Sequence, residues 1–361
     1  MNKSKILVLF MIFAAAMSAF ADITVTGEAP TLSNPDLNGL MQDAYNDLLG
    51  DLQDMIGGIN SKPEKLIRAW GNSAVFASHG GTHRGYSGYK FMTITLGSMI
   101  GMQLPDSPLG IISDVSNLKD KILNDGDIDL GFSPQFLNAQ IGFNTSFLVK
   151  HLYLGARLGW FTLPGLVDGL SFKTTTVGVT ANYQLLPSLG IAKIIVWRGI
   201  NLGSGIIFNN SRLEYSLPLD PMSQDMGGGV SLAVDPTIKL NMKINTVTVP
   251  LEAMTALKLL IFNIPFGVGA DVSFGKSNIG IGLDAEINTE GLPSGVTQEK
   301  PGNFNVKAGG SMPPYFFNTK IMTGIGFNFG PVMIDIPFTY YLPGKNKNNG
   351  FNVGVTAGAS F

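Results

Sequence analysis

The sequence predicts an all-β fold: a transmembrane antiparallel β-barrel of about 12 to 14 strands, with a small helical plug or cap at its N-terminus. The last eleven residues alternate strictly between apolar and small or polar side chains. Charged residues make up only 14% of the 361 residues, too few to cover a water-facing surface of this size. No long apolar run follows the N-terminus, so lipid-spanning helices are excluded. A closed barrel is the remaining way to satisfy every backbone group in lipid.

Residues 1–21 are expected to form a signal peptide for export. Lys3 and Lys5 precede an apolar core, and small residues surround a cleavage point before Asp22. A membrane anchor is the alternative, which the shortness of the apolar stretch disfavours. The chain contains no cysteine, which excludes a lipoprotein anchor, a disulfide framework and thiolate chemistry.

Residues 22–88 are predicted to form a plug inside the lumen or a cap at its periplasmic mouth. A helix is expected from Asn34-Pro35-Asp36 to Gly57, because leucines recur at helical spacing until two glycines end the pattern. A second helix is expected over residues 63–70, followed by an irregular segment over residues 71–88. The alternative is a flexible leader, although amphipathic helices usually pack against something.

Residues 89–361 are predicted to form the barrel, because the apolar period changes to two. The clearest alternation covers residues 263–274, and a second one covers residues 278–287. In the second, Asp284 and Glu286 share one face, which we assign to the lumen because charges are costly in hydrocarbon. The candidate strands cover residues 89–102, 137–147, 152–160, 177–183, 201–217, 229–240, 246–257, 263–274, 278–287, 316–329, 332–342 and 351–361.

The predicted connections alternate between short and long, as they do between the periplasmic and outer ends of bacterial barrels. The short set is Val149-Lys150, Asn245, Gly275-Lys276 and Gly330-Pro331, and the long set covers residues 103–134, 218–228, 288–315 and 343–349. Residues 187–200 break the alternation and hold either a surface helix or an extra hairpin, which would raise the count to fourteen. A helical pattern over residues 111–123 either folds into the channel or lies solvated on the surface.

The closing strand carries a resemblance to a known class of protein. From Phe351 to Phe361 the apolar residues share one face, and the chain ends on an aromatic residue. This strand resembles the closing strand of bacterial outer-membrane β-barrel proteins. The resemblance implies a diderm outer membrane, with Phe361 as an insertion signal for the barrel assembly machinery and outer-membrane lipid as a partner. The alternative for this segment alone is a half-buried strand of a secreted sandwich.

A second resemblance concerns the N-terminal region. Asn34, Pro35 and Asp36 resemble the Asn-Pro-Ala motif near the start of the long-chain fatty-acid transporter (FadL-like) family, with a departure at the third residue. A barrel of this size with a separate N-terminal hatch also resembles that family. The resemblance implies passage of a hydrophobic cargo, with these three residues belonging to the plug.

Catalytic and metal-binding patterns are weak. His79 and His83 have the spacing of a helical metal pair, but the glycines between them disfavour a helix and no carboxylate is nearby. His151 falls on a lumen face beside a tight turn, and nothing marks a serine as a nucleophile. We therefore expect no metal, no cofactor and no enzymatic activity, with an outer-membrane hydrolase as the weakest alternative. The net charge of −2 without a basic stripe predicts no nucleic-acid partner.

Mid-strand charges are the candidate functional residues, expected to line the lumen. They are Arg157, Lys239, Lys243, Asp271, Asp284, Glu286, Lys320 and Asp335. Both signs occur, so strong ion selectivity is not predicted, and pairing across the lumen is an alternative role. The sequence thus predicts a channel for passive uptake of small molecules, and the second resemblance implies that these are hydrophobic. The alternative is a surface adhesin or structural barrel that acts through its extracellular loops.

Overall fold

The computed structural model describes residues 22–57, 63–79, 81–84, 89–104, 130–164, 169–192, 194–218, 221–225, 229–343 and 349–361. Within these ranges the chain forms a 15-stranded antiparallel sheet, a separate two-stranded sheet and two helices. The expected signal peptide over residues 1–21 and the helical pattern over residues 111–123 lie outside the described residues.

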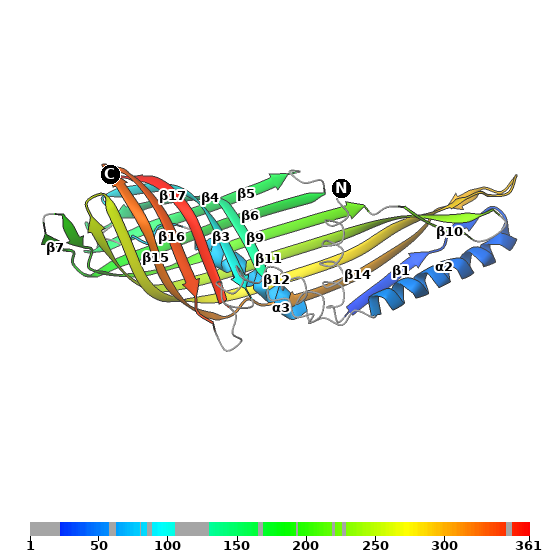
Figure 1. The fold of residues 1–361 in the computed structure, drawn as a ribbon, viewed down its shortest axis with the longest axis horizontal. Coiled ribbons are helices and arrows are strands. Elements are labelled where there is room, and N and C mark those ends of the chain that lie inside the picture. Colours follow the sequence, from blue (N-terminus) through cyan, green and yellow to red (C-terminus); the bar gives the residue numbers. More distant parts are fainter. Residues whose placement is uncertain are drawn as a thin grey trace, which may run out of the picture.

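Ten strands of the described sheet close a ring, in the order β12, β15, β16, β17, β3, β4, β5, β6, β9 and β11 (Figure 1). The ring closes because β11 pairs with β12 along the full length of both strands. The predicted barrel fold is confirmed, with the remaining strands attached outside the ring. The ring strands are β3 (Met92–Leu104), β4 (Gly131–Asn144), β5 (Leu152–Pro164), β6 (Leu170–Leu186), β9 (Ile200–Pro218), β11 (Ser231–Leu259), β12 (Phe262–Glu290), β15 (Phe317–Phe329), β16 (Val332–Tyr341) and β17 (Asn349–Ser360).

The short connections gather at one end of the ring, which we call the turn end. The Ser360 N–H donates to Pro331 O at 2.8 Å and the Asn328 N–H donates to Ile261 O at 2.7 Å, so the β15–β16 turn, the β11–β12 turn and the C-terminus lie together. A short hairpin of β7 (Leu189–Ala192) and β8 (Ile195–Trp197) also lies here. Residues 187–200 therefore contain the hairpin and not a surface helix.

Inside the ring the usual distribution of side chains is reversed. Large apolar side chains point outward and remain exposed, as for Phe266 (55%) and Val268 (50%). Polar side chains point inward and are buried, as for Thr248 and Asp271, both at 0%. In β17 the residues alternate as the sequence predicts, with Asn352 and Thr356 buried on the inner face. An apolar outer belt around a polar interior is the arrangement of a barrel solvated by lipid.

The two longest strands reverse this arrangement part of the way along. β11 and β12 each contain 29 residues, about 95 Å of extended chain, whereas a tilted strand crosses a membrane in about ten residues. The outward side chains of β12 are apolar up to Phe274 and polar or glycine from Lys276 onward. Its inward side chains are polar or small up to Ser277 and apolar from Ile279. The side-chain alternation is continuous, but the apolar residues change face.

The same change occurs at one level in five neighbouring strands. The last apolar outward residues are successive register partners across β5, β6, β9, β11 and β12, namely Leu158, Val177, Phe208, Val247 and Phe274. The next outward row is Trp160, Thr175, Asn210, Asn245 and Lys276, again paired across the strands. We call this second row the boundary row. A tryptophan followed by polar side chains is typical of the edge of the hydrocarbon layer.

This arrangement corrects two predicted turns. Asn245 and Gly275-Lys276 were expected as tight connections, but Asn245 pairs with Lys276 in the middle of the β11–β12 ladder. The expected strands over residues 229–240 and 246–257 are one strand, as are those over residues 263–274 and 278–287. A change of the apolar face resembles a turn when a single lipid-facing side is assumed for every strand.

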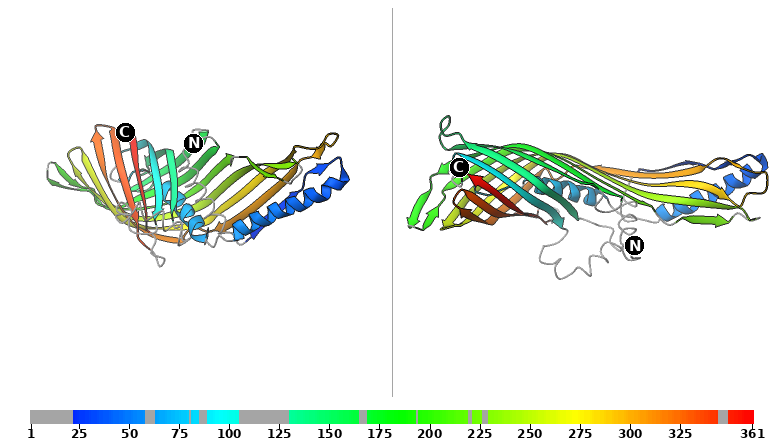
Figure 2. Two further views of the ribbon diagram at one scale, coloured as in Figure 1. Left: turned by 45° about the vertical axis from the view of Figure 1, so that its right-hand side comes forward. Right: turned by 90° about the horizontal axis from the view of Figure 1, so that it is seen from above.

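Beyond the boundary row the sheet continues as an open extension, which Figures 1 and 2 show projecting from the ring. It consists of the ends of β9, β11 and β12, together with β14 (Gly302–Met312), β1 (Asp22–Glu28) and β10 (Met222–Asp225). Helix α2 (Pro35–Gly57) lies along it, and β2 (Thr31–Leu32) pairs with β13 (Gln298–Lys300) beside it. The connection expected over residues 288–315 therefore contains two strands, β13 and β14. Strand β14 pairs with the part of β12 that lies in the extension, and β15 pairs with the part of β12 that lies in the ring.

The inner face of the extension packs against α2. Met41 and Tyr45 of the helix are buried with Ile281, Phe304 and other apolar residues of the sheet. The Tyr45 hydroxyl donates to Asn303 O at 3.1 Å, and burial raises the pKa of this phenol, which therefore remains a donor. Helix α2 thus shields the apolar inner face of the extension from water. Among the described residues, no helix is long and apolar enough to cross a membrane, a finding that does not concern β-barrels.

One pair of substitutions tests where the membrane lies. Leu251 and Asn241 share the outer face of β11 on opposite sides of the boundary row, and Leu251 is 50% exposed. We expect Leu251→Arg to lower the free energy of unfolding by about 2–4 kcal/mol, because a charge near the bilayer midplane is costly. Asn241→Arg should change it by less than about 0.5 kcal/mol, as for an ordinary surface site. Urea unfolding in liposomes measures the free energy of unfolding of both variants. Equal effects of the two substitutions would mean that the membrane boundary does not lie between Leu251 and Asn241.

Candidate functional site

Helix α3 (Pro63–Ser78) fills the mouth of the ring on the side of the extension. Residues 71–78, expected to be irregular, are its last two turns, and Asn72, Ser73 and Val75 are fully buried. Barrel glycines permit the close approach. A Cβ added at Gly101 would lie 2.3 Å from Ser73 O, and one at Gly131 would lie 2.1 Å from Ala69 O. Helix α3 therefore rests directly on the backbone of β3 and β4.

Polar contacts fix α3 in the mouth. Asn72 donates to Gln103 Oε1 at 2.6 Å and accepts from the Tyr315 N–H at 2.7 Å. Asn352 of β17 donates to Phe76 O at 2.8 Å, which satisfies a carbonyl in the last turn of the helix. The Phe76 ring stacks on a buried tyrosine of β16, with 3.7 Å between ring centroids. The helix is thus held from several sides of the ring.

A charged cluster lies below α3 in the lumen. Lys320 is buried, and its Nζ lies 2.7 Å from Asp271 Oδ1 and 2.5 Å from Glu252 Oε1. His79 follows α3, with Nδ1 2.8 Å from Val75 O and Nε2 3.2 Å from Asp271 Oδ1. Both ring nitrogens of His79 thus face oxygen atoms. The cluster joins the chain that follows α3 to β11, β12 and β15.

A second ion pair lies nearer the turn end. Arg84 is 2% exposed and binds Asp335 of β16 in a bidentate manner, with contacts of 2.7 Å from Nε and 2.6 Å from Nη2. The same guanidinium donates to Asn328 and to Phe327 O. Bidentate arginine–carboxylate pairs combine charge with fixed geometry. The chain after α3 is thus fixed at two levels before β3 begins at the turn end.

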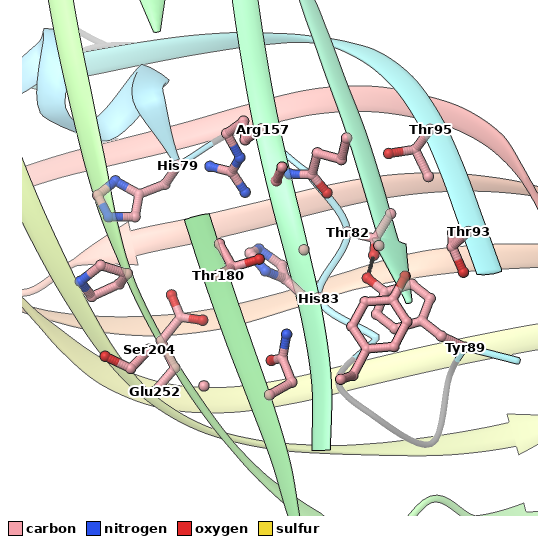
Figure 3. A pocket seen from close by; sticks show the side chains of 18 of the residues that line it. His79, Thr82, His83, Tyr89, Thr93, Thr95, Arg157, Thr180, Ser204 and Glu252 are labelled. Carbon is pink, nitrogen blue, oxygen red and sulfur yellow. Dashed lines mark hydrogen bonds between the residues drawn. The ribbon is translucent and has the colours of Figure 1, made fainter. Parts of the chain in front are cut away.

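A cavity of about 70 Å³ remains between this chain and the barrel wall, which is space for a few water molecules (Figure 3). Arg157 and Glu252 line it from the barrel, and His79, His83 and Tyr89 line it from the plug side. Arg157 donates to Ser78 O at 2.7 Å, and His83 Nε2 lies 3.2 Å from Thr339 Oγ1. The cavity is polar, and the plug closes it toward the mouth.

The predicted lumen residues separate into two groups. Arg157, Asp271, Lys320 and Asp335 lie in the lumen beside the plug. The prediction is wrong for the other four, Lys239, Lys243, Asp284 and Glu286, because they occupy the outer, water-facing side of the extension. Lys239 pairs there with Asp284 at 2.6 Å, with 59% of the lysine side chain exposed. These residues follow the change of apolar face, so the polar side of the strand is outside at that level.

The remaining predicted residues also have defined positions. Asn34, Pro35 and Asp36 lie at the start of α2 on the extension and not in the lumen, so their assignment to the plug is wrong. Asn34 caps that helix, because its Oδ1 accepts from the Asp36 N–H at 3.0 Å. Phe361 lies at the turn end, where its backbone pairs with Met92. His151 is exposed in the β4–β5 turn with φ of 66°, away from the lumen.

Three site residues were not predicted from the sequence: His79 as a neighbour of Asp271, Arg84 and Glu252. Arg84 and His79 belong to a glycine-rich segment that carried no periodic signal. Glu252 was detectable, because it is the single charged residue in the expected strand over residues 246–257. Among the described residues, no group of three or more His, Cys, Asp or Glu side chains is placed to hold a metal ion.

Comparison with solved structures finds barrels of several kinds. The translocator domain of the autotransporter NalP from Neisseria meningitidis is 10% identical, covers 90% of this chain and 98% of its own, and has a TM-score of 0.28. The toluene transporter TodX from Pseudomonas putida, of the FadL family, is 10% identical over 81% and 97%, with a TM-score of 0.25. The outer-membrane protease OmpT from Escherichia coli is 8% identical over 75% and 95%, with a TM-score of 0.33.

The predicted β-barrel architecture rests on the closed ring of strands described above. No curated protein sequence matches the chain. A family model described as Lsa36-like matches residues 18–361, nearly the whole chain. The chain belongs to the Lsa36-like family.

Proposed function

We propose that this protein is an outer-membrane barrel that displays its extension at the cell surface, where the extension binds a macromolecular partner. The observation that supports this proposal most is the continuity of β11 and β12, which run from the turn end through the membrane belt and into the extension without a break. The barrel then serves as an anchor. This function corresponds to the adhesin alternative, except that the binding surface is a folded sheet with a helix and not a set of loops.

The orientation follows from the connections. Short turns lie at the periplasmic end of bacterial barrels and long segments lie outside. The described turns at residues 260–261 and 330–331 share the turn end with the C-terminus. The extension projects from the opposite end of the ring. We therefore assign the turn end to the periplasm, with Phe361 as the insertion signal recognised during barrel assembly.

A groove on the outer face of the extension is a candidate contact surface. It measures about 500 Å³ and is lined by Lys239, Asp284 and Lys307 over a floor that includes Gly282 and Gly309. A Cβ at Gly282 would have its nearest neighbour at 3.5 Å, an ordinary contact, and one at Gly309 would lie 3.3 Å from Ile279 O, which must shift by a few tenths of an ångström, so larger side chains can project into the groove at both positions. Charged walls over a smooth floor suit an extended polar segment of a partner.

Two measurements test the proposal. The chain contains no cysteine, so single cysteines at Glu286 and Lys150 report on opposite ends of the molecule. A membrane-impermeant maleimide should label intact cells at Glu286→Cys and not at Lys150→Cys. Cells that display the full chain should then bind protein-coated surfaces, and Gly282→Trp with Gly309→Trp should reduce that binding at least tenfold. Labelling at Lys150→Cys alone, or binding unchanged by the filled groove, would refute the proposal.

A second candidate is controlled passage of a small solute. The specific observation in its favour is the cavity beside Arg157 and Glu252, together with charges of both signs in the lumen. These polar walls favour a polar solute over a hydrophobic one. Helix α3 closes the mouth, so this function requires the helix to move, and conductance measurements on a displaced helix test it in the Discussion.

A further inference from the structure

The outer face of the extension carries a row of cations immediately above the membrane belt. Lys173 of β6 is the register partner of Arg212 of β9, and Arg212 is the register partner of Lys243 of β11. We call these three residues the basic row. Because register partners lie about 5 Å apart, the three cations occupy neighbouring positions across three strands. Lys276 of β12 adds a fourth cation in the adjacent boundary row.

All four side chains point outward and are exposed. The acidic group that faces them from the next outward row is Glu214, which pairs with Arg212 at 2.5 Å. Among the described residues, no ion pair involves Lys173, Lys243 or Lys276. Four cations and one carboxylate give a local charge of about +3 at this level. Like charges opposite each other across strands destabilise a sheet unless an anion lies between them.

The position of the basic row indicates which anion it takes. The row lies two rows outside Val177, Phe208 and Val247, which are the last lipid-facing residues of the same three strands. Each row corresponds to two residues, so the distance along the strand is about 13 Å. Barrel strands tilt by about 40°, so the basic row stands about 10 Å above these residues, and its long side chains can reach down to headgroup phosphates, which lie within about 5–7 Å of the hydrocarbon edge. Cations near such a surface bind anionic lipids. Trp160 lies between the two levels, as an interfacial anchor does.

We propose that the basic row binds the phosphate groups of phosphorylated lipids in the leaflet on the extension side of the barrel. The inference rests on the barrel spanning a membrane, and it does not depend on what the extension binds. Headgroup phosphates neutralise Lys173, Arg212 and Lys243, and the acyl chains of the same lipid pack on Val177, Phe208 and Val247. The ligand is thus recognised by charge and by apolar contact in one stretch of the outer wall.

The test compares two triple variants of the full chain refolded in mixed micelles. The first replaces the basic row, as Lys173→Gln, Arg212→Gln and Lys243→Gln. The control removes the same number of charges from the extension farther from the membrane, as Lys239→Gln, Lys300→Gln and Lys307→Gln. The probe is fluorescent diphosphoryl lipid A, with the same lipid lacking both phosphates and inorganic phosphate as competitors. Tryptophan fluorescence and resistance to protease verify that each variant is folded.

We expect the wild type to prefer diphosphoryl lipid A over the phosphate-free lipid by at least tenfold. Each cation at a lipid surface contributes a factor of roughly five, so the basic-row variant should bind roughly 100-fold more weakly. The control variant should stay within about twofold, and the affinity should fall with salt. Equal binding of the two lipids, equal loss in both variants, or full competition by inorganic phosphate would overturn the proposal. If the triple variant does not fold, Lys243→Gln alone should still weaken binding severalfold.

Discussion

Lys320→Met is expected to lower the free energy of unfolding by about 3–5 kcal/mol, because it leaves the fully buried Asp271 and the partly buried Glu252 without their cation. Asp271 is fully buried and Lys320 is 2% exposed, so water cannot replace the lost partner. Replacing the carboxylates of Asp271 and Glu252 by amides should reverse this loss of stability. The triple variant Lys320→Met, Asp271→Asn and Glu252→Gln should recover most of the stability, since a neutral cluster has no unpaired charge. Urea unfolding of the refolded protein in liposomes measures each variant.

The matched control for this prediction is Lys239→Met, which breaks the Lys239–Asp284 pair on the outer face of the extension. That pair is exposed to water, so its loss should cost less than about 1 kcal/mol. If Lys320→Met and Lys239→Met destabilise the protein equally, the cluster in the lumen is hydrated and does not hold the plug as the geometry indicates.

Gly101→Leu is expected to open the barrel. Any Cβ at this position meets the backbone of α3, 2.3 Å from Ser73 O and 2.5 Å from the Ala77 nitrogen, so the helix must leave its seat. Single-channel recording in a planar bilayer should show negligible conductance for the wild type and stable open events for Gly101→Leu. A conducting variant would support solute passage as the second function, because it would show a continuous path once α3 is displaced.

Gly280→Leu is the control for this experiment. Its Cβ has 3.9 Å to its nearest neighbour and lies on the outer face of the extension, so it should leave the conductance at the wild-type level. If Gly101→Leu is folded and still does not conduct, the lumen below α3 is closed by its own side chains. In that case Arg84 with Asp335 and the Lys320 cluster form the barrier, and display of the extension remains as the function.

The sequence predicts the barrel because apolar residues alternate along the strands of the ring. It fails at Asn245 and Gly275-Lys276, where the pattern changes face without a turn. Alternation identifies two sides of a strand but does not reveal which side faces lipid, and that depends on the height of the residue above the bilayer. Lys239, Lys243, Asp284 and Glu286 were misplaced for this single reason.

The lumen site is only half predictable, for a related reason. Arg157, Asp271, Lys320 and Asp335 stand out as charges on apolar strands, and the structure places them in the lumen. Their partners Arg84 and His79 come from a segment whose position depends on α3 seating on Gly101 and Gly131. Close approach of a helix to a strand backbone is a tertiary property, and glycine in a sequence does not disclose which surface it accommodates.

The unbroken β11–β12 ladder has a mechanical consequence. Register partners run from Ser231 with Glu290 to Leu259 with Phe262, so no flexible joint separates the part outside the membrane from the part within it. A force that pulls β11 and β12 together along their length is therefore carried by their hydrogen bonds to the neighbouring ring strands β9 and β15, which must slide together before any of them yields. On the proposed function, a load applied to the extension by a bound partner would therefore pass straight into the barrel wall.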